Sequence, residues 1–325
     1  MYDAETGLIR TALLTALAGA AITWVCAPRI IDMLLQTVGP RVNYRRRPTS
    51  FPVGLALILG ATGGPVVATI VSPQARAAPV LMGHAACFIL TLGFGLAGLA
   101  DDLLGGHDHS GFRGHLGAMR RGVVTTGVLK IVMGAIVSLG AAALMTAAAG
   151  SATGTATGAA IGTVTRTATG TVTARISSLW FLVRLALDSA LIAASANLVN
   201  LLDRRPGRAI KSFLVGTLGA VSWIALSKGA EQAFRAAASC AGMVGAAVAI
   251  LPLDLAEQIM LGDTGSNPLG AVLGLLLLRL APGARIALLA LLAWLTLTSE
   301  RVSFSQAIDS NRVLRFLDRL GRKDP

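Results

Sequence analysis

Nine long apolar runs constrain the fold of this chain more than any other feature of its sequence. Each run is long enough, or nearly long enough, to cross the ~30 Å hydrocarbon core of a bilayer. The alternating pattern of a membrane β-barrel does not occur in them, so we expect the spans to be helices. The runs lie near 7–27, 51–71, 79–100, 123–148, 178–199, 212–227, 237–253, 267–281 and 284–299.

Composition agrees with a membrane location. Hydrophobic residues make up 54% of the 325 residues and charged residues make up 14%, against about 25% charged residues in a typical soluble domain. Cys26, Cys87 and Cys240 lie far apart inside apolar runs, which favours small buried side chains over a disulfide framework or a metal site. The sequence therefore predicts an all-α, polytopic transmembrane helix bundle of about nine spans.

The distribution of basic residues predicts the orientation of this bundle. A formal charge of +12 would suggest a nucleic-acid partner in a soluble protein, but in a membrane protein its meaning depends on the side of the bilayer. With the N-terminus outside, 18 of the 28 Lys and Arg residues fall on cytoplasmic segments, as the positive-inside rule requires. We therefore expect a multi-pass protein of the inner (plasma) membrane, with a cytoplasmic C-terminus and no nucleic-acid partner. The cytoplasmic segments are 28–50, 101–122, 200–211, 254–266 and 300–325.

Two segments differ from the rest of the expected transmembrane domain, 1–300. Residues 146–177 carry TATG twice in a tract of Ala, Thr and Gly, a composition that cannot bury a core, so we expect a flexible outer loop. Residues 301–325 form a basic cytoplasmic tail that can fold into an amphipathic helix at the lipid surface, or into a solvated helix. Its apolar side would hold Ile308, Val313, Leu314, Leu317 and Leu320, with Arg312, Arg315 and Arg319 available to lipid phosphates.

Polar residues cluster where the third and fourth runs meet the predicted cytoplasmic side. Asp101 and Asp102 close the third run, and adjacent carboxylates favour a hard cation such as Mg²⁺ or a proton-transfer role. The alternative for this pair is a solvated helix end. Lys130 lies about two turns inside the fourth run, where it either snorkels to the interface or reaches a polar cavity that could hold phosphate.

Two further clusters follow on the same predicted side. NLVNLLDRRPGRAIK, 197–211, ends an apolar run on Asn200 and Asp203 and then places four cations directly behind them. Basic residues often mark the cytoplasmic end of a span, but this does not explain the amide and the carboxylate. GDTGS, which begins at Gly262, offers backbone amides and a carboxylate at a helix start, a geometry that suits phosphate held through a metal, or an ordinary turn.

The shared side of all four clusters suggests that they meet. Turn residues without a common purpose would be scattered over both faces of the membrane. We therefore expect one cytoplasmic cavity that gathers Asp101, Asp102, Asn200, Asp203 and Asp263 together with Lys130.

These motifs resemble those of the polyprenyl-phosphate N-acetylhexosamine-1-phosphate transferases (glycosyltransferase 4), the family that includes phospho-N-acetylmuramoyl-pentapeptide transferase. The likeness covers roughly residues 40–300, and the combination is more specific than any one motif. It rests on the DD pair (Asp101, Asp102), on N-x-x-N-x-x-D (Asn197, Asn200, Asp203), on GDTGSNPLG from Gly262 to Gly270, on FPVGLAL at 51–57 and on Lys130.

The resemblance implies a magnesium-dependent phosphotransferase of cell-envelope glycan synthesis, such as that of peptidoglycan. A UDP-linked N-acetylamino sugar would give its sugar 1-phosphate to undecaprenyl phosphate, and membrane lipids would surround the enzyme; a homodimer is also considered. By resemblance, Asp101, Asp102 and Asp263 would be catalytic, and Asp263 and Asp203 would hold Mg²⁺. The implied substrate-binding residues are Lys130, Asn197, Asn200, Asp203, Arg204, Arg205, Arg208, Gly262 and Thr264.

Two departures from the family pattern motivate a second hypothesis. Where many members read DGLDGLA, this chain reads DRRPGRA, so Pro206 replaces an aspartate that helps relatives to recognise the nucleotide base. The histidine-rich motif of a late cytoplasmic loop is also missing, although His107, His109 and His115 follow Asp102. The alternative is therefore a catalytically impaired relative that binds lipid phosphate and acts as a partner in envelope assembly.

A third hypothesis, a transporter, arises from the charges of Arg184, Asp188 and Lys130 inside the spans. Arg184 and Asp188 lie four residues apart on one helix face and are expected to pair, which reduces the cost of burying both. Against transport, the acidic residues gather at one predicted face and do not trace a path across the membrane.

Overall fold

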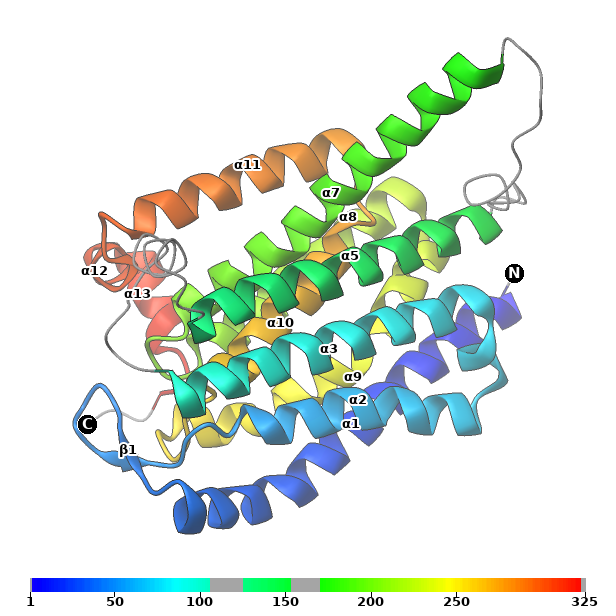
Figure 1. Ribbon diagram of the computed structural model, residues 1–325. Coiled ribbons are helices and arrows are strands. Elements are labelled where there is room, and N and C mark those ends of the chain that lie inside the picture. Colours follow the sequence, from blue (N-terminus) through cyan, green and yellow to red (C-terminus); the bar gives the residue numbers. More distant parts are fainter. Residues whose placement is uncertain (1, 106–124, 153–169, 323–325) are drawn as a thin grey trace.

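The computed structural model describes residues 2–105, 125–152 and 170–322 of the chain. Long helices run side by side through the molecule, and a two-stranded antiparallel sheet lies at one end (Figure 1). The elements are α1 (Tyr2–Thr37), β1 (Arg41–Val42), β2 (Pro48–Thr49), α2 (Gly54–Val71), the 3₁₀ turn η1 (Pro73–Arg76), α3 (Ala78–Leu104), α5 (Thr126–Ala152), α7 (Gly170–Leu202), α8 (Arg208–Lys228), α9 (Ala230–Leu255), α10 (Asp263–Leu277), α11 (Pro282–Ser299), α12 (Phe304–Ser310) and α13 (Arg312–Arg319).

Eight helices of the described residues are long and apolar enough to cross a membrane. The eighth expected run, 267–281, differs because it forms α10, which has only 15 residues. At 1.5 Å per residue α10 spans about 22 Å, which is short of a ~30 Å hydrocarbon core. Most of its side chains are buried, because α3, α7 and α8 pack around it. α10 is therefore apolar because it is the central helix of the bundle, surrounded by other helices.

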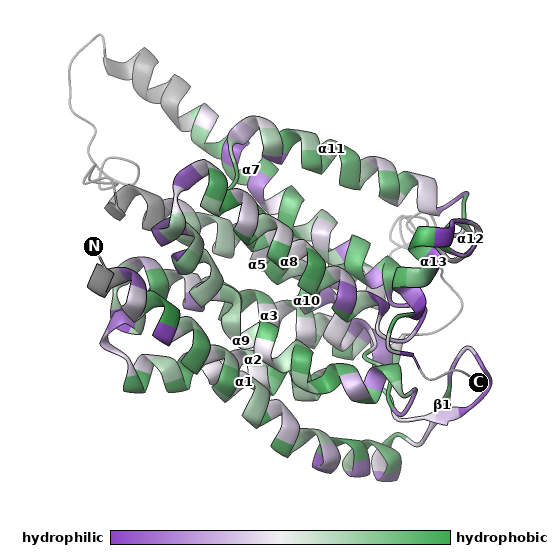
Figure 2. Ribbon diagram, turned by 180° about the vertical axis from the view of Figure 1, so that it is seen from behind, coloured by the Kyte–Doolittle hydropathy of each residue, from purple (hydrophilic) through white to green (hydrophobic). Residues whose placement is uncertain are grey.

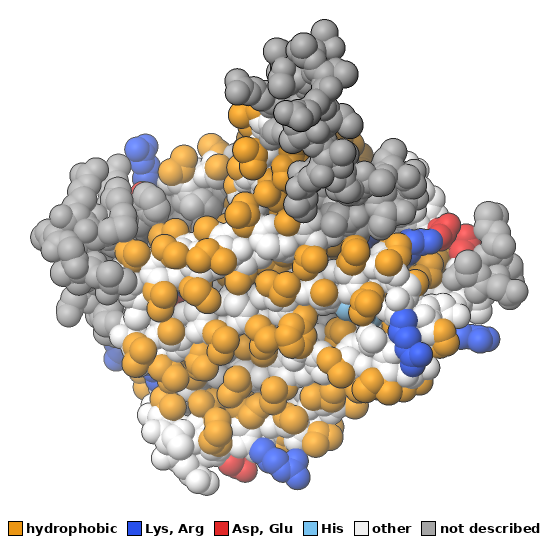
Figure 3. Space-filling view, turned by 45° about the vertical axis from the view of Figure 1, so that its right-hand side comes forward, with side chains coloured by type: hydrophobic (Ala, Val, Ile, Leu, Met, Phe, Trp, Pro, Cys, Tyr) orange, Lys and Arg blue, Asp and Glu red, His pale blue; other side chains and the backbone are white. Residues whose placement is uncertain are grey.

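The surface of the bundle matches a lipid environment. Helices are hydrophobic through the middle of the molecule and hydrophilic toward its two ends (Figure 2). One face carries a broad field of hydrophobic side chains with Lys and Arg along its margins (Figure 3). Leu17, Ile70 and Leu226 are 68%, 67% and 88% exposed, and an apolar surface of this extent is unfavourable in water. The protein is therefore an all-α polytopic membrane protein.

Polar loops gather at one end of the bundle. The sheet, α12, α13 and the C-terminus lie together there, and the N-terminus lies at the opposite end (Figure 1). The C-terminal ends of α3 and α7 and the N-terminal ends of α5, α8 and α10 reach the same polar end, because successive long helices alternate in direction. The four sequence clusters therefore share one end of the molecule, as expected.

The 146–177 segment, the cysteines and the C-terminal tail were each the subject of a sequence prediction. α5 continues to Ala152 and α7 begins at Gly170, so both ends of the 146–177 segment are helical and 153–169 lie outside the described residues. Cys87 and Cys240 are buried free thiols, as predicted, whereas Cys26 is a free thiol that is only partly buried. The tail folds into α12 and α13. Its apolar residues Val313 and Leu317 are 66% and 51% exposed, so they remain available to lipid.

The expected pairing of Arg184 with Asp188 is confirmed at 3.7 Å. Asp188 makes a closer contact with α11, because the Arg285 Nη1 donates to its two carboxylate oxygens at 2.7 and 2.8 Å. This ion pair joins α7 to α11 at the end opposite to the sheet. Lys130 lies at the other end of the bundle. Arg184, Asp188 and Lys130 therefore do not form the continuous path through the molecule that a transporter would need.

α3 approaches α10 closely at Gly98. A Cβ atom added there would lie 2.3 Å from the Asp263 carbonyl oxygen, which is too close for any side chain. We expect Gly98→Ala to push the two helices apart and to destabilise the protein by about 1–3 kcal/mol, as overpacking does. The matched control is Gly140→Ala on α5, where an added Cβ meets nothing within 4 Å. Thermal unfolding in detergent measures both, and equal effects would contradict the close approach.

Candidate functional site

A cavity of about 230 Å³ opens at the polar end of the bundle. Its walls come from the 43–51 loop, the end of α3, the end of α7 with the loop after it, and the segment between α9 and α10. Five carboxylates face two guanidinium groups in its lining. The lining residues are Asn43, Tyr44, Phe51, Asp102, Asn200, Asp203, Arg204, Arg205, Pro206, Asp254, Glu257, Ile259, Met260, Leu261, Gly262 and Asp263.

Asp102 fastens the N-terminus of α10. Its carboxylate accepts hydrogen bonds from the backbone N–H groups of Asp263 (3.1 Å) and Thr264 (2.9 Å) and from the Thr264 hydroxyl (2.6 Å). The first N–H groups of a helix have no partner inside that helix, so a carboxylate from α3 serves here as the cap. The Thr264 side chain is fully buried in this contact. Asp102 therefore fixes the position of Asp263.

Gly262 makes this approach sterically accessible. Its φ of +70° lies in a region that glycine adopts without strain, and an added Cβ would lie 2.5 Å from a carboxylate oxygen of Asp102. Gly262 therefore contributes to the site through its backbone, which lets the carboxylate of Asp102 approach the start of α10.

Lys130 reaches the polar cluster and does not snorkel away from it. Its ammonium lies 3.3 Å from the Asp101 carboxylate and also pairs with the carboxylate of Asp263. All three side chains are about one-quarter exposed, at 25%, 26% and 23% for Lys130, Asp101 and Asp263. The lysine thus links the second turn of α5 to the C-terminal end of α3 and the N-terminal end of α10, beside the cavity.

Asp203 has the least compensated charge in the cavity. Within the described residues its carboxylate makes no hydrogen bond or ion pair. Burial raises the pKa of Asp203 well above the ordinary range of an aspartate, and the negative charges of Asp254 and Asp263 raise it further. The neighbouring Asn200 accepts a hydrogen bond from the Ser266 hydroxyl at 3.0 Å, which joins α7 to α10. An added cation would offset the repulsion at this position.

The segment before α10 contributes residues to which the sequence assigned no role. Asp254 accepts a hydrogen bond from the Gly207 N–H at 2.7 Å, and Glu257 accepts from Asn43 (3.3 Å) and Tyr44 (3.1 Å). Backbone hydrogen bonds also join Met260 to the 50–53 segment. Asp254 and Glu257 belong to the acidic cluster before GDTGS, which was the signal available. Asn43 and Tyr44 carry no signal in the sequence.

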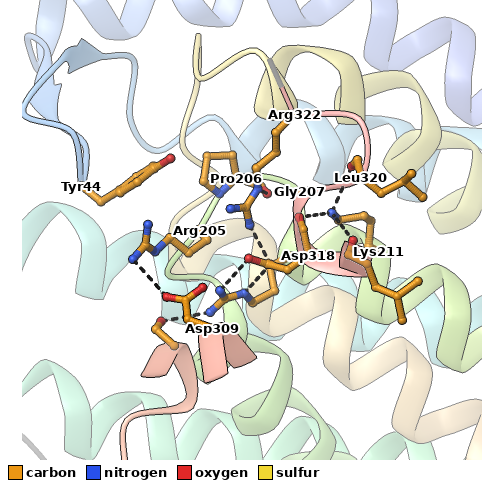
Figure 4. A network of polar contacts seen from close by, with 12 residues as sticks. Tyr44, Arg205, Pro206, Gly207, Lys211, Asp309, Asp318, Leu320 and Arg322 are labelled. Atoms are coloured by element: carbon orange, nitrogen blue, oxygen red, sulfur yellow. Dashed lines mark hydrogen bonds and ion pairs between the residues drawn. The ribbon is translucent and has the colours of Figure 1, made fainter. Parts of the chain in front are cut away.

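The C-terminal tail holds the loop after α7 (Figure 4). Asp318 accepts hydrogen bonds from Arg208 at 2.8 and 3.0 Å and from Arg322 at 2.7 Å. Arg322 also donates to the Pro206 carbonyl at 3.0 Å, so the tail reaches a residue of the cavity wall. The Lys211 ammonium donates to three backbone carbonyls of the 317–320 segment at 2.6–3.2 Å. The tail therefore positions this wall of the cavity.

The structure brings most, but not all, of the predicted site residues together. Arg208 is only 4% exposed and pairs with Asp318, so it is turned away from the cavity. Asn197 donates to the Thr296 hydroxyl on α11 at 3.1 Å, also outside the cavity lining. The guanidinium of Arg205 lies 4.5 Å over the ring of Tyr44, and Arg204 is exposed at the rim. His107, His109 and His115 lie outside the described residues.

The donor set of the cavity fits Mg²⁺. Within the described residues, no group of three or more His, Cys, Asp or Glu side chains is arranged to hold a metal on its own. Mg²⁺, however, is commonly bound through one or two carboxylates, with water and substrate phosphates filling the other positions. Asp203 and Asp263 both line the cavity and come from different elements, and Asp203 has a free carboxylate. They are the residues that could hold the ion.

No protein-family model and no curated protein matches this chain. The functional interpretation therefore rests on the residues of the cavity.

The ion pair between Arg208 and Asp318 generates a stability prediction. Both side chains are only 5% exposed, so Asp318→Ala leaves a buried, unpaired guanidinium and is expected to cost about 3–5 kcal/mol. The matched control is Asp309→Ala, because Asp309 is half-exposed and lies 3.9 Å from Arg205, a pair expected to contribute about 0–1 kcal/mol. Thermal unfolding in detergent compares the variants, and a neutral Asp318→Ala would contradict the network.

The same pair has a defined pH dependence. Burial alone raises the pKa of the Asp318 carboxyl, but the hydrogen bonds and charge of Arg208 outweigh it, so the pKa lies below its ordinary value. The contribution of a carboxyl with a lowered pKa is present above the unfolded pKa of about 3.9 and is lost as pH falls through the folded value. The difference in unfolding temperature between wild type and Asp318→Ala should therefore shrink only in strongly acidic buffer.

Proposed function

We propose that this protein is a magnesium-dependent phosphotransferase that moves a sugar 1-phosphate from a UDP-linked N-acetylamino sugar to undecaprenyl phosphate. One observation carries the proposal. Asp102, Asn200, Asp203 and Asp263, from motifs far apart in the sequence, line one cavity beside Lys130. These are the motif positions on which the family resemblance rests.

The proposed reaction brings two anions together. A phosphate oxygen of the lipid attacks the phosphorus that bears the sugar, the bond between the two phosphates of the donor breaks, and UMP leaves. The product is a lipid-linked pyrophosphate that carries the sugar. Such a transfer requires positioning and neutralisation of charge more than covalent chemistry by the protein. The cavity of about 230 Å³ is suited to the phosphate-bearing part of the substrates.

The proposed roles follow from the surroundings of each side chain. Asp203 and Asp263 would hold Mg²⁺, which when bound neutralises phosphate charge and polarises the bond that breaks. Lys130 would orient phosphate while its contacts with Asp101 and Asp263 hold it in place. Arg204 and Arg205, at the cavity wall, would bind the donor phosphates as hydrogen-bonded cations.

The adjacent aspartates would have different roles. Asp102 accepts three hydrogen bonds from the start of α10, so it is a positioning residue for Asp263. Asp101 contacts Lys130, and we assign to it the task of assisting the lipid phosphate as nucleophile. Pro206 lines the cavity at the position of an aspartate in many members of the family, so the base of the nucleotide would be held differently.

The proposed location is the plasma membrane with the cavity open to the cytoplasm. The described segments at the cavity end, 28–50, 200–211 and 300–322, carry 14 of the 28 Lys and Arg residues, and basic loops remain on the cytoplasmic side of membrane proteins. Nucleotide-linked sugars are cytoplasmic, so this orientation presents the cavity to the donor.

The alternative is a relative that binds lipid phosphate without turnover. It is favoured by the engagement of Asp102 in the cap of α10 and by the pairing of Asp101 and Asp263 with Lys130. Of the five carboxylates that line the cavity, only Asp203 is then without a partner among the described residues.

A transfer assay separates these functions. Purified protein is given radiolabelled UDP-GlcNAc or UDP-MurNAc-pentapeptide with undecaprenyl phosphate and Mg²⁺, and labelled lipid is extracted and counted. We expect transfer that falls at least about 100-fold in Asp263→Asn, the range seen when one charge-stabilising group is removed from an active site. The control is Asp32→Asn, because Asp32 is an exposed carboxylate near the same end, outside the cavity.

The outcomes of this assay are distinct. Equal transfer by Asp263→Asn and wild type would contradict the proposed site. If neither donor reacts while undecaprenyl phosphate still binds in the presence of Mg²⁺, the binding function replaces the transferase function.

Asp203 generates a prediction about metal and pH that needs no turnover. Because the folded-state pKa of Asp203 is raised, its contribution to stability is greatest at low pH and is lost as pH rises through that pKa. Mg²⁺ should restore the loss, so its effect on the unfolding temperature should grow with pH. Asp203→Asn should reduce both effects, whereas Asp32→Asn should reduce neither. A magnesium effect that is the same in Asp203→Asn would exclude this carboxylate as a ligand.

A further inference from the structure

A second large cavity lies at the opposite end of the bundle. Its volume is about 500 Å³, and it is bounded by the beginnings of α3, α9 and α11, the later part of α5, the middle of α7 and the ends of α8 and α10. α10 separates it from the acidic cavity by its full length of about 22 Å. Five cations line it, namely Arg184, Lys228, Arg235, Arg279 and Arg285.

The charges of these cations are only partly balanced. Asp188 is the one acidic residue in the lining among the described residues, and it is shared between Arg184 and Arg285. Arg235 pairs with Glu231 one turn away on α9. No ion pair is present for Lys228 or Arg279 in the described part of the chain. The cavity therefore carries an excess of positive charge, which attracts an anion.

Two guanidinium groups of this cavity, those of Arg279 and Arg285, have hydrogen-bond donors available for an anion. Arg285 is 9% exposed, and its Nε is buried without a hydrogen-bond partner in the described structure, although its Nη1 binds Asp188. Among the described residues, the guanidinium of Arg279 has only the Ser239 hydroxyl as a hydrogen-bond partner, at 3.3 Å. A buried donor without a partner is unfavourable, and an acceptor such as a phosphate oxygen would satisfy it.

An apolar groove continues from this cavity. It has a volume of about 300 Å³ between α7 and α11, and it shares Arg184, Asp188 and Arg285 with the cationic cavity. Trp180, Leu187 and Ile286 line the groove, and they are 68%, 38% and 55% exposed. The groove lies along the lipid-facing side of two helices that are long enough to span the membrane.

We propose that the cationic cavity and the groove together bind one anionic phospholipid, with its phosphate in the cavity and an acyl chain in the groove. The charge complementarity favours a phosphate over a zwitterionic head-group, and the groove favours a lipid over a free anion. This site lies at the far end of α10 from the acidic cavity, so it goes beyond the proposed function and does not depend on it.

Native mass spectrometry of the detergent-purified full chain tests this proposal. The protein is titrated with phosphatidylglycerol, with phosphatidylcholine of the same acyl chains, and with inorganic phosphate. We expect phosphatidylglycerol to bind tightest, and Lys228→Gln combined with Arg279→Gln to weaken it about tenfold or more, because charge-assisted hydrogen bonds to phosphate are lost. Gln at 279 keeps a donor for Ser239. The control combines Arg10→Gln with Arg76→Gln, which are exposed cations near the same end outside the cavity.

A second pair of variants tests the groove. Leu187→Ala combined with Ile286→Ala should weaken the binding of phosphatidylglycerol and leave the binding of inorganic phosphate unaffected. Both positions are exposed and would keep an apolar side chain toward lipid. Equal affinity for the two lipids, or unchanged binding by the Lys228 and Arg279 variant, would overturn the proposal. Binding of inorganic phosphate as tightly as phosphatidylglycerol, with no effect of the groove variants, would identify a free-anion site and overturn the lipid assignment.

Discussion

The capping of α10 by Asp102 is the interaction on which the candidate site depends. A carboxylate at the end of α3 binds the first two N–H groups of α10 and the buried Thr264 hydroxyl. Without it, two backbone donors at the first turn of the central helix would lack partners, which is costly where they are shielded from water. The cap also fixes the position of Asp263, the first residue of α10. It therefore holds the Asp263 carboxylate in contact with Lys130. The Asp102 carboxylate thus supplies hydrogen-bond acceptors for two backbone N–H groups and orients the side chains that the proposed chemistry requires.

A second constraint comes from the C-terminal tail. Arg208, Asp318 and Arg322 form a buried network that ties α13 to the loop after α7. That loop carries Asp203, whose charge is poorly compensated and would repel its neighbours if the wall were free to move. The loop is held from one side by the tail and from the other by Asp254, which accepts from the Gly207 N–H. Repulsion inside the cavity is therefore opposed by attraction behind its wall.

The sequence predicted the fold class and much of the cavity for clear physical reasons. Apolar length identifies helices in lipid, and polar residues at helix ends on one predicted side were bound to lie near each other, as Asp102, Asn200 and Asp263 do. Hydropathy did not separate α10 from a membrane span, because a helix surrounded by other helices is as apolar as one surrounded by lipid. It also could not predict that Arg208 meets Asp318, since a partner 110 residues away depends on the tertiary fold.

The length and direction of α10 have an electrostatic consequence. The aligned peptide dipoles of a helix place partial positive charge at its N-terminus and partial negative charge at its C-terminus. α10 begins at the carboxylates of Asp102 and Asp263 and ends beside Arg279. Each pole therefore faces side chains of the opposite sign, and the central helix is electrostatically matched to its surroundings at both ends. Turning α10 end for end would place each pole against like charge, so the charge pattern of the two cavities favours a single direction of this helix.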